Sequence, residues 1–230
     1  MYKTSKIKIP SVLEDILKEL QEIGATPILV GGSVRDHFLI IPIKDYDIEI
    51  FGINSLEIIQ NCLEKFGCVK LVGKSFGVLT LRVNEYDFDF ALPRIEKKTG
   101  NTHQDFEVIT NANLSFKEAA IRRDFTINAI GYDFFKQEFL DPFDGINDLK
   151  TKTIKYINDI TFIEDSLRVY RAVQFASRFD FEIDENTFTS AKKLNDGIIQ
   201  TPNETAVKID AFVNRIDEFE TGSFVDIRKI

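Results

Sequence analysis

The stretch PILVGGSVRDHFLIIPIKDYDIEIF, residues 27–51, decides the fold. Its short apolar run predicts a buried strand, which ends at Gly31 and Gly32. Residues 34–39 then predict a short helix. From Lys44 to Phe51, polar and apolar residues alternate with the period of a strand that buries one face. The chain thus places a diglycine turn and a helix between two strands.

Two aspartates, Asp45 and Asp47, begin the second strand. Residues two apart in a strand point to the same face, so these carboxylates project together while Tyr46 and Ile48 point into the core. Two carboxylates held this close repel each other unless a proton or a cation lies between them. Mg²⁺ is the natural cation, because it prefers oxygen ligands from carboxylates and phosphates. The same pattern also occurs on solvent-facing edge strands.

A third acid, Asp89, lies in the alternating segment 86–91, which predicts another strand. If the two strands are neighbours, three carboxylates suit a two-metal centre for phosphoryl transfer. Glu49 follows the same alternation, and we interpret it as solvated or as a residue behind the metal ligands.

The diglycine turn predicts a phosphate site. Glycines between a strand and a helix let the backbone approach a phosphate, and the positive helix end then points at it. Arg35, one turn into the helix, can bind a phosphate or a carboxylate as a fork.

The remaining sequence predicts a mixed α+β half followed by a helical half, with the boundary near residue 141. Residues 93–113 are polar and predict a mobile loop. Residues 186–220 are weakly helical. The other expected elements are helices at 11–24, 55–66 and 115–123, strands at 69–72, 78–83 and 86–91, a hairpin at 130–140, and a helix with an apolar stripe over 169–179.

The composition excludes several classes of protein. The 230 residues are 43% hydrophobic and 29% charged, which is ordinary for a globular chain that can bury a core. No apolar run is long enough to span a membrane, and the N-terminus lacks a secretory signal, so we expect a cytoplasmic protein. Two cysteines and two histidines leave little for a disulfide framework or a zinc enzyme.

The net charge of −8 argues against attraction of the whole chain to nucleic acid. An RNA substrate would therefore depend on local clusters of basic residues. Such clusters occur at Lys97–Lys98, at Arg122–Arg123, and at Lys150, Lys152 and Lys155.

Four motifs occur in a fixed order: LVGGSVRD (29–36), KDYD (44–47), RRDFTINA (122–129) and EDSLRVYR (164–171). Together they resemble the class II tRNA nucleotidyltransferase (CCA-adding enzyme) and bacterial poly(A) polymerase family, over about residues 25–185. The resemblance implies an α+β nucleotidyltransferase fold. Its head, residues 1–140, would hold a palm-like mixed sheet with flanking helices, and residues 141–230 would form an all-helical neck.

The resemblance also implies roles for single residues. Asp45 and Asp47 would be catalytic metal ligands, with Asp89 in the place of a third, more variable acid. Gly32 and Arg35 would hold the triphosphate. The other implied nucleotide-binding residues are Arg122, Asp124 and Asn128, the last two at the ribose, and Asp165, Arg168 and Arg171.

The spacing of three of these residues also suggests a role without the resemblance. They are Asp165, Arg168 and Arg171. Their spacing places them on one face of a helix, away from the apolar stripe. A carboxylate beside a guanidinium can form hydrogen bonds with the edge of cytosine or adenine. The resemblance implies that Asp165 and Arg168 select between CTP and ATP in this way. A solvated salt bridge is the alternative.

The implied activity is the Mg²⁺-dependent addition of CMP and AMP, from CTP and ATP, to the 3′ end of tRNA. A poly(A) polymerase, a CC- or A-adding relative, and an inactive nucleotide- or RNA-binding module remain open. Family members continue beyond the neck into domains that grip tRNA. No pattern in residues 186–230 matches them, so we expect the RNA grip to need missing C-terminal domains or a protein partner.

Overall fold

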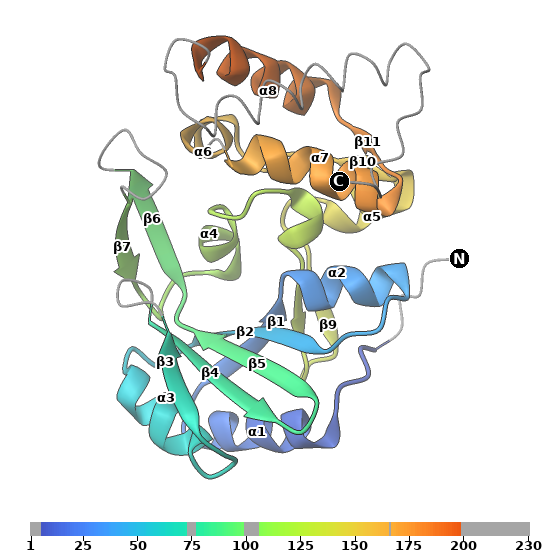
Figure 1. The fold of residues 1–230 in the computed structure, drawn as a ribbon. Helices are drawn as coiled ribbons and strands as arrows, with labels where there is room; N and C mark the ends of the chain where they lie inside the picture. Colours follow the sequence, from blue (N-terminus) through green and yellow to red (C-terminus); the bar gives the residue numbers. More distant parts are fainter. Residues whose placement is uncertain (1–5, 73–76, 99–105, 166, 199–230) are drawn as a thin grey trace.

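The computed structural model describes residues 6–72, 77–98, 106–165 and 167–198. Its centre is a seven-stranded sheet with the order β3-β4-β5-β2-β1-β8-β9 (Figure 1). β2 and β5 pair in parallel, and every other neighbouring pair in this sheet is antiparallel. The strands are β1 (Thr26–Val30), β2 (Asp45–Phe51), β3 (Val69–Val72), β4 (Val78–Val83), β5 (Tyr86–Ala91), β8 (Gly131–Asp133) and β9 (Glu138–Leu140).

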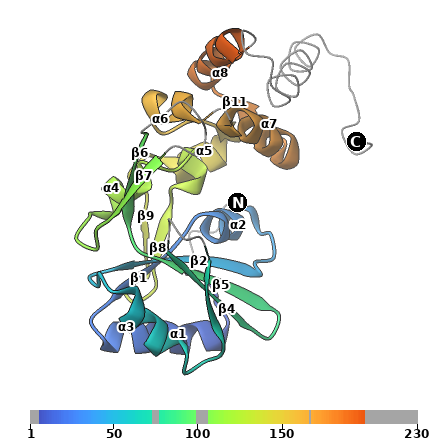
Figure 2. The same ribbon diagram turned by 60° about the vertical axis from the view of Figure 1, so that its left-hand side comes forward.

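One face of the sheet is apolar and closed. Helices α1 (Ser11–Glu22) and α3 (Leu56–Leu63) lie on this side in Figures 1 and 2. The apolar positions of β2 and β5 belong to the same core cluster as the buried side of α1. The alternation along these strands leaves their polar residues on the opposite face.

The opposite face carries α2 (Gly32–Leu39), α4 (Phe116–Ala120) and the 3₁₀ turn η1 (Thr126–Asn128). A small apolar cluster, which includes Val30, Phe51 and Ala119, packs α4 against β1 and β2. The polar positions of β2 and β5 lie outside this cluster, so their charged side chains are available for a site.

The last described part of the chain is helical apart from one pair of short strands. It contains α5 (Gly145–Thr151), α6 (Asp159–Glu164), α7 (Leu167–Phe179) and α8 (Glu185–Ile198), and β10 (Thr153–Ile154) pairs in parallel with β11 (Glu182–Ile183). These helices lie across from the sheet in both ribbon views (Figure 2). The weakly helical stretch predicted at 186–220 is described only to Ile198. The rest of it lies outside the described residues.

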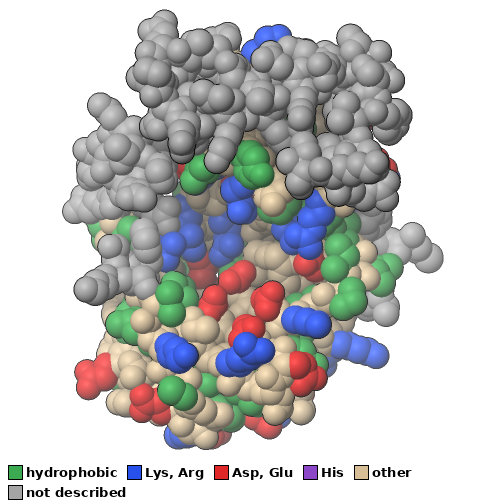
Figure 3. All heavy atoms as spheres, in the orientation of Figure 1, with side chains coloured by type: hydrophobic (Ala, Val, Ile, Leu, Met, Phe, Trp, Pro, Cys, Tyr) green, Lys and Arg blue, Asp and Glu red, His purple; other side chains and the backbone are tan. Residues whose placement is uncertain are grey.

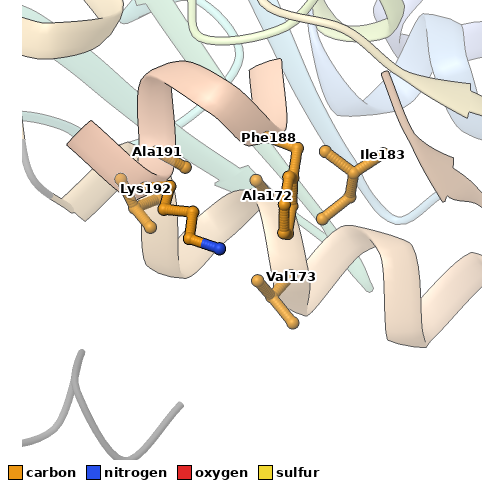
Figure 4. Close-up of a pocket in the computed structure, with 7 residues that line it drawn as sticks. Ala172, Val173, Ile183, Phe188, Ala191 and Lys192 are labelled. Carbon is orange, nitrogen blue, oxygen red and sulfur yellow. The ribbon is translucent and has the colours of Figure 1, made fainter. Parts of the chain in front are cut away.

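Helices α7 and α8 enclose a small pocket together with β11 (Figure 4). Ala172, Val173, Ile183 and Phe188 are among its walls. Apolar walls of this kind indicate a gap in side-chain packing between two helices. None of the predicted site residues lines this pocket.

The predicted loop at 93–113 is wrong in part, because the structure forms a hairpin there. β6 (Arg94–Lys98) pairs antiparallel with β7 (Phe106–Thr110), and residues 99–105 lie outside the described part. Ile95 and Ile109 are exposed, at 44% and 51%. Apolar residues that stay exposed in a strand do not mark a buried face, so the sequence of this segment predicts a loop. None of the described helices combines the length and apolar character that a membrane span requires.

Candidate active site

Three carboxylates meet on the open face of the sheet. The parallel register pairs Asp47 with Asp89, and side chains paired in this way share a face. Asp45, two residues before Asp47, lies on the same face. Tyr46 and Ile48 point the other way and are only 4% and 1% exposed. The pairing of β2 with β5 therefore brings the three aspartates onto one face of the sheet, as predicted.

The surroundings of Asp47 favour its neutral form. Its side chain is reached by solvent, but the protein around it displaces much of the water, and this loss of hydration is the main cause that raises its pKa. Arg123 opposes the rise, whereas the charges of Asp89, Glu49 and Asp45 add to it. A bound cation would remove this repulsion.

The donor chemistry of the site suits a hard divalent cation. Carboxylate oxygens from two neighbouring strands are the ligands that Mg²⁺ uses together with phosphate oxygens. Thr80 donates a hydrogen bond of 2.7 Å to Asp89 Oδ1, which fixes one of these carboxylates. Within the described ranges, no group of three or more His, Cys, Asp or Glu side chains is arranged so that it could hold a metal ion. The fit to a metal therefore lies in the donor type of Asp45, Asp47 and Asp89, which are all carboxylates.

The diglycine turn brings the backbone close to the acids. Gly31 has a φ of 70°, a conformation that favours glycine, and α2 begins directly after it. A Cβ atom on Gly31 would lie 3.0 Å from Asp47 Oδ2 and 3.2 Å from Arg123 Nη1. A Cβ on Gly32 would meet only Arg35 Nη2, at an ordinary 3.4 Å. Gly31 is thus the glycine that the geometry requires, whereas the sequence singled out Gly32.

Glu49 is buried beside the acids and is not solvated, so that part of its interpretation is wrong. It is 1% exposed, and Arg122 Nη2 and Arg123 Nη2 donate to its Oε1 at 2.5 and 3.3 Å. Burial raises the pKa of Glu49, but Arg123 and Arg122 together outweigh it and lower the pKa overall. Glu49 therefore stays ionised behind the site.

The position of Arg122 and Arg123 follows from the helix before them. α4 begins at a capping box in which Ser115 Oγ accepts from the backbone N–H of Glu118 and the Glu118 carboxylate accepts in return. The helix ends at Ala120, whose carbonyl accepts from Arg123 N at 3.0 Å. Both arginines follow directly and reach Glu49 on the sheet.

Four of the predicted nucleotide-binding residues form one hydrogen-bonded chain. Arg171 Nε donates to Asp124 Oδ2 at 2.7 Å, and Asn128 Nδ2 donates to Asp124 Oδ1 at 2.9 Å. Arg35 Nη1 donates to Asn128 Oδ1 at 2.7 Å, and Arg35 Nε to Asp36 at 2.8 Å. This chain joins α7, η1 and α2. The roles of these residues toward triphosphate and ribose stay predictions.

Two phenylalanines of α7 complete this contact. The guanidinium of Arg35 lies 5.1 Å from the Phe175 ring centre and 4.9 Å from that of Phe179, and Arg171 lies 5.0 Å from Phe175. Guanidinium groups are attracted to aromatic faces at such distances. Arg35 is 6% exposed, so the structure gives it a packing role in addition to its predicted phosphate contact.

The fourth motif is arranged differently from its prediction. Asp165 has an extended backbone between α6 and α7, so it does not share one helix with Arg168 and Arg171. Its Oδ1 accepts a hydrogen bond from Leu167 N at 3.0 Å, which caps the start of α7. The prediction that Asp165 lies on one helix face with Arg168 and Arg171 is therefore wrong. Asp165 still lies 3.9 Å from Arg168 Nε.

Arg168 also contacts the head. Its Nη2 and Nη1 donate to the carbonyls of Arg122 and Arg123 at 2.6 and 3.3 Å. The residue predicted to read the base therefore also fastens α7 to the segment after α4.

Figure 3 shows acidic side chains facing Lys and Arg side chains across a hollow between the sheet and the helices. We call the carboxylates Asp45, Asp47 and Asp89 the acid face. The arginine seam comprises Arg35, Arg122, Arg123, Arg168 and Arg171. An anionic group between these two surfaces would be attracted by the arginine seam on one side. On the other side, metal ions would have to neutralise the acid face before an anionic group could bind there.

Sequence reasoning gave Arg123 no role at the active site, and for Glu49 it left a solvated position and a position behind the metal ligands both open. The signal for Glu49 was present, because its place in the alternation of β2 puts it on the face of Asp45 and Asp47. Its burial depends on α4 and on the arginines that follow, which strand periodicity does not reveal.

Comparison with known proteins agrees with the geometry. The family model of the poly A polymerase head domain matches residues 28–155, more than half of the chain. The multifunctional CCA protein of Haemophilus ducreyi is 37% identical over 169 residues, which cover 72% of this chain and 39% of that protein. Its counterpart in Nitrosospira multiformis is 36% identical over 159 residues, which cover 69% and 36%. The chain thus spans about two fifths of the length of these relatives.

Solved structures show the same fold. A CCA-adding enzyme in complex with CTP superposes with a TM-score of 0.69 at 26% identity, covering 88% of this chain and 46% of that one. The CCA-adding enzyme of Bacillus stearothermophilus with CTP gives a TM-score of 0.68 at 25% identity, covering 88% and 48%. With its ordered motifs, its sheet and these relatives, the chain belongs to the class II CCA-adding enzyme family, whose members carry the poly(A) polymerase head domain.

Proposed function

We propose that this chain transfers CMP and AMP from CTP and ATP to the 3′ end of tRNA, without a nucleic-acid template, by two-metal phosphoryl transfer. The observation that carries the proposal is the acid face opposite the arginine seam. Three carboxylates share one face of the sheet close to linked arginines, in a chain of the CCA-adding family, and Figure 3 shows acidic and basic side chains on the two sides of a hollow.

The acid face would hold the metal. Asp45 and Asp47, with Asp89 as the third acid, would bind two Mg²⁺ ions. Bound there, the metal would neutralise the triphosphate and make the terminal hydroxyl of the RNA easier to ionise. Lost hydration and, to a smaller extent, the charges of Asp89, Glu49 and Asp45 raise the pKa of Asp47, and a bound cation would favour its ionised form, which supports this assignment.

The nucleotide would lie between the acid face and the arginine seam. The turn at Gly31–Gly32 allows close approach of a phosphate, and Arg122, bonded to Glu49 on the neighbouring strand, would offer a guanidinium donor. Asp124 and Asn128 would orient the ribose. On α7, Arg168 with Asp165 would read the base edge, and Arg171 would add a further nucleotide contact. The protein then contributes position and charge rather than covalent chemistry.

The test is incubation of the full chain with Mg²⁺, each labelled nucleoside triphosphate, and tRNAs that end before CCA, after C and after CC. We expect CMP on the first two acceptors, AMP on the third, and a stop once CCA is complete. CMP addition alone or AMP addition alone would identify a specialised relative and contradict full CCA addition.

Two further outcomes would overturn the proposal. Continued AMP addition would identify a poly(A) polymerase, the activity after which the matching family model is named. Nucleotide binding without incorporation, with and without extra RNA-binding protein, would identify an inactive binding module.

A further inference from the structure

Glu49 and Arg123 are bonded to each other but are incompletely satisfied. Glu49 Oε2 and Arg123 Nε are both buried without a hydrogen-bond partner. Their mutual bond, at 3.3 Å, is long for a charged pair, whereas Arg122 approaches the same carboxylate to 2.5 Å. The Nε atom of Arg122 is buried without a hydrogen bond as well, so the distances to Glu49 distinguish the two arginines, and Arg123 is the one held less tightly.

Asp47 is the other carboxylate near the guanidinium of Arg123, whose charge lowers the pKa of Asp47. Both Asp47 Oδ2 and Arg123 Nη1 flank the space above Gly31, where an added Cβ would lie 3.0 and 3.2 Å from them. Asp47 and Glu49 lie two residues apart on one strand face. Arg123 therefore lies between two carboxylates, of which Asp47 is open to solvent and Glu49 is buried.

The backbone of Arg123 is fixed from two sides. Its N–H donates to the carbonyl of Ala120 at 3.0 Å, and its own carbonyl accepts from Arg168 Nη1 at 3.3 Å. The side-chain torsions of Arg123 are thus left to decide which carboxylate its guanidinium approaches.

From this geometry we propose that Glu49 is a positioning residue: it holds the guanidinium of Arg123 away from Asp47 and so keeps Asp47 open to a divalent cation. This inference rests on the proposed function in one respect: it takes the cation at Asp47 to be the metal ion that the transfer reaction uses. If Glu49 lost its charge, Arg123 would turn to Asp47, and the metal would then have to displace a guanidinium.

A double-mutant cycle on the full chain tests the inference without any catalytic readout. The four proteins are wild type, Glu49→Gln, Arg123→Gln and the double variant, and the measurement is Mn²⁺ binding without nucleotide, followed by the electron paramagnetic resonance signal of free Mn²⁺. Such a cycle separates coupling between two residues from the sum of their charges.

We expect Glu49→Gln to raise the Kd for Mn²⁺ about tenfold, the size of effect seen when a residue supporting a metal ligand is lost. Arg123→Gln alone should change the Kd less than about threefold, because Glu49 already holds this arginine away. In the Glu49→Gln background, the same substitution should restore the wild-type Kd to within about threefold. Glu19→Gln, which removes a surface carboxylate paired with Lys65 on the far side of the sheet, is the matched control and should leave the Kd unchanged.

Additive effects of the two substitutions would overturn the inference, because they would show that only the summed charge matters. If Glu49→Gln does not fold, Glu49→Asp replaces it in the same cycle, since it keeps the charge but moves it away from Arg123. Additivity there would equally overturn the inference. A wild-type chain that binds no Mn²⁺ without nucleotide would overturn this inference alone, whereas missing CMP transfer with a coupled cycle would contradict the proposed function alone.

Discussion

The acid face and the arginine seam border the same hollow, but they are built differently. Asp45, Asp47 and Asp89 come from two adjacent strands, and their positions follow from strand alternation and one register. The arginines come from α2, from the segment after α4 and from α7, and each described guanidinium is bonded to protein groups of another element.

Because they are built differently, the two surfaces should contribute differently to ligand binding and to the stability of the fold. On the acid face, lost hydration and then the charges of Asp89, Glu49 and Asp45 raise the pKa of Asp47, so ionised Asp47 does not stabilise the fold. The arginines connect the sheet to the helices, so they are part of the structure even without a nucleotide. Substitutions on the acid face should therefore lower activity without lowering stability, whereas substitutions in the seam should lower stability as well.

The largest effect is expected for Asp47→Ala. Loss of this carboxylate should lower CMP transfer by at least about 10³-fold, because it removes charge stabilisation where the metal would bind. Thermal unfolding should show a midpoint equal to or above that of the wild type. Asp15→Asn, on α1 at the closed face, is the control and should leave transfer unchanged. Substantial residual transfer by Asp47→Ala would remove Asp47 from the metal site.

Within the seam, Arg35→Met should cause the largest loss of stability. Its side chain is 7% exposed and is bonded to Asp36 and Asn128, so its loss leaves buried polar groups without partners. We expect the free energy of unfolding in urea to fall by about 3 kcal/mol. Arg171→Met, at a side chain 46% exposed, should lower it by only about 1 kcal/mol. Equal losses would show that burial does not set the contribution of these arginines.

Arg168→Ala tests whether one residue of the seam both fastens α7 and reads the base. The ratio of kcat/KM for CTP and ATP on matched acceptors should shift by about tenfold, equivalent to about 1.4 kcal/mol of discrimination. Arg178→Ala, at an exposed position of the same helix, should leave the ratio unchanged. Unchanged selectivity in Arg168→Ala would leave this residue with a structural role only.

The smallest effect concerns pH, measured without metal. Since the folded state raises the pKa of Asp47 above 3.8, it binds this proton more tightly than the unfolded chain does, and ionisation of Asp47 destabilises the fold. Asp47→Asn should therefore be more stable than the wild type above the raised pKa, by no more than about 1 kcal/mol at this solvent-reached site. This gain should shrink as the pH falls through that pKa toward 3.8. A gain that grows on acidification would contradict the sign of the shift.

Much of the acid face could be predicted from the sequence. The alternation around Asp47 and Asp89 predicts two strands with their carboxylates on one face, and the structure pairs these strands as required. The diglycine turn was also predicted, although the choice between Gly31 and Gly32 depended on a backbone angle that the sequence does not show. The hairpin of β6 and β7 was not predicted, because the segment is largely polar and its Ile95 and Ile109 are exposed instead of marking a buried face.

The sequence by itself determined the elements with a repeating pattern: the strands that carry the acids, the helices that cover the closed face, and the four ordered motifs that identify the family. Only the tertiary structure decided the partners of the arginines, because these bonds join residues as far apart as Arg35 and Asn128 or Glu49 and Arg122. Strand and helix periodicity acts between neighbours along the chain. A long, charged side chain can reach many partners, and the packing of α4 and α7 against the sheet selects among them.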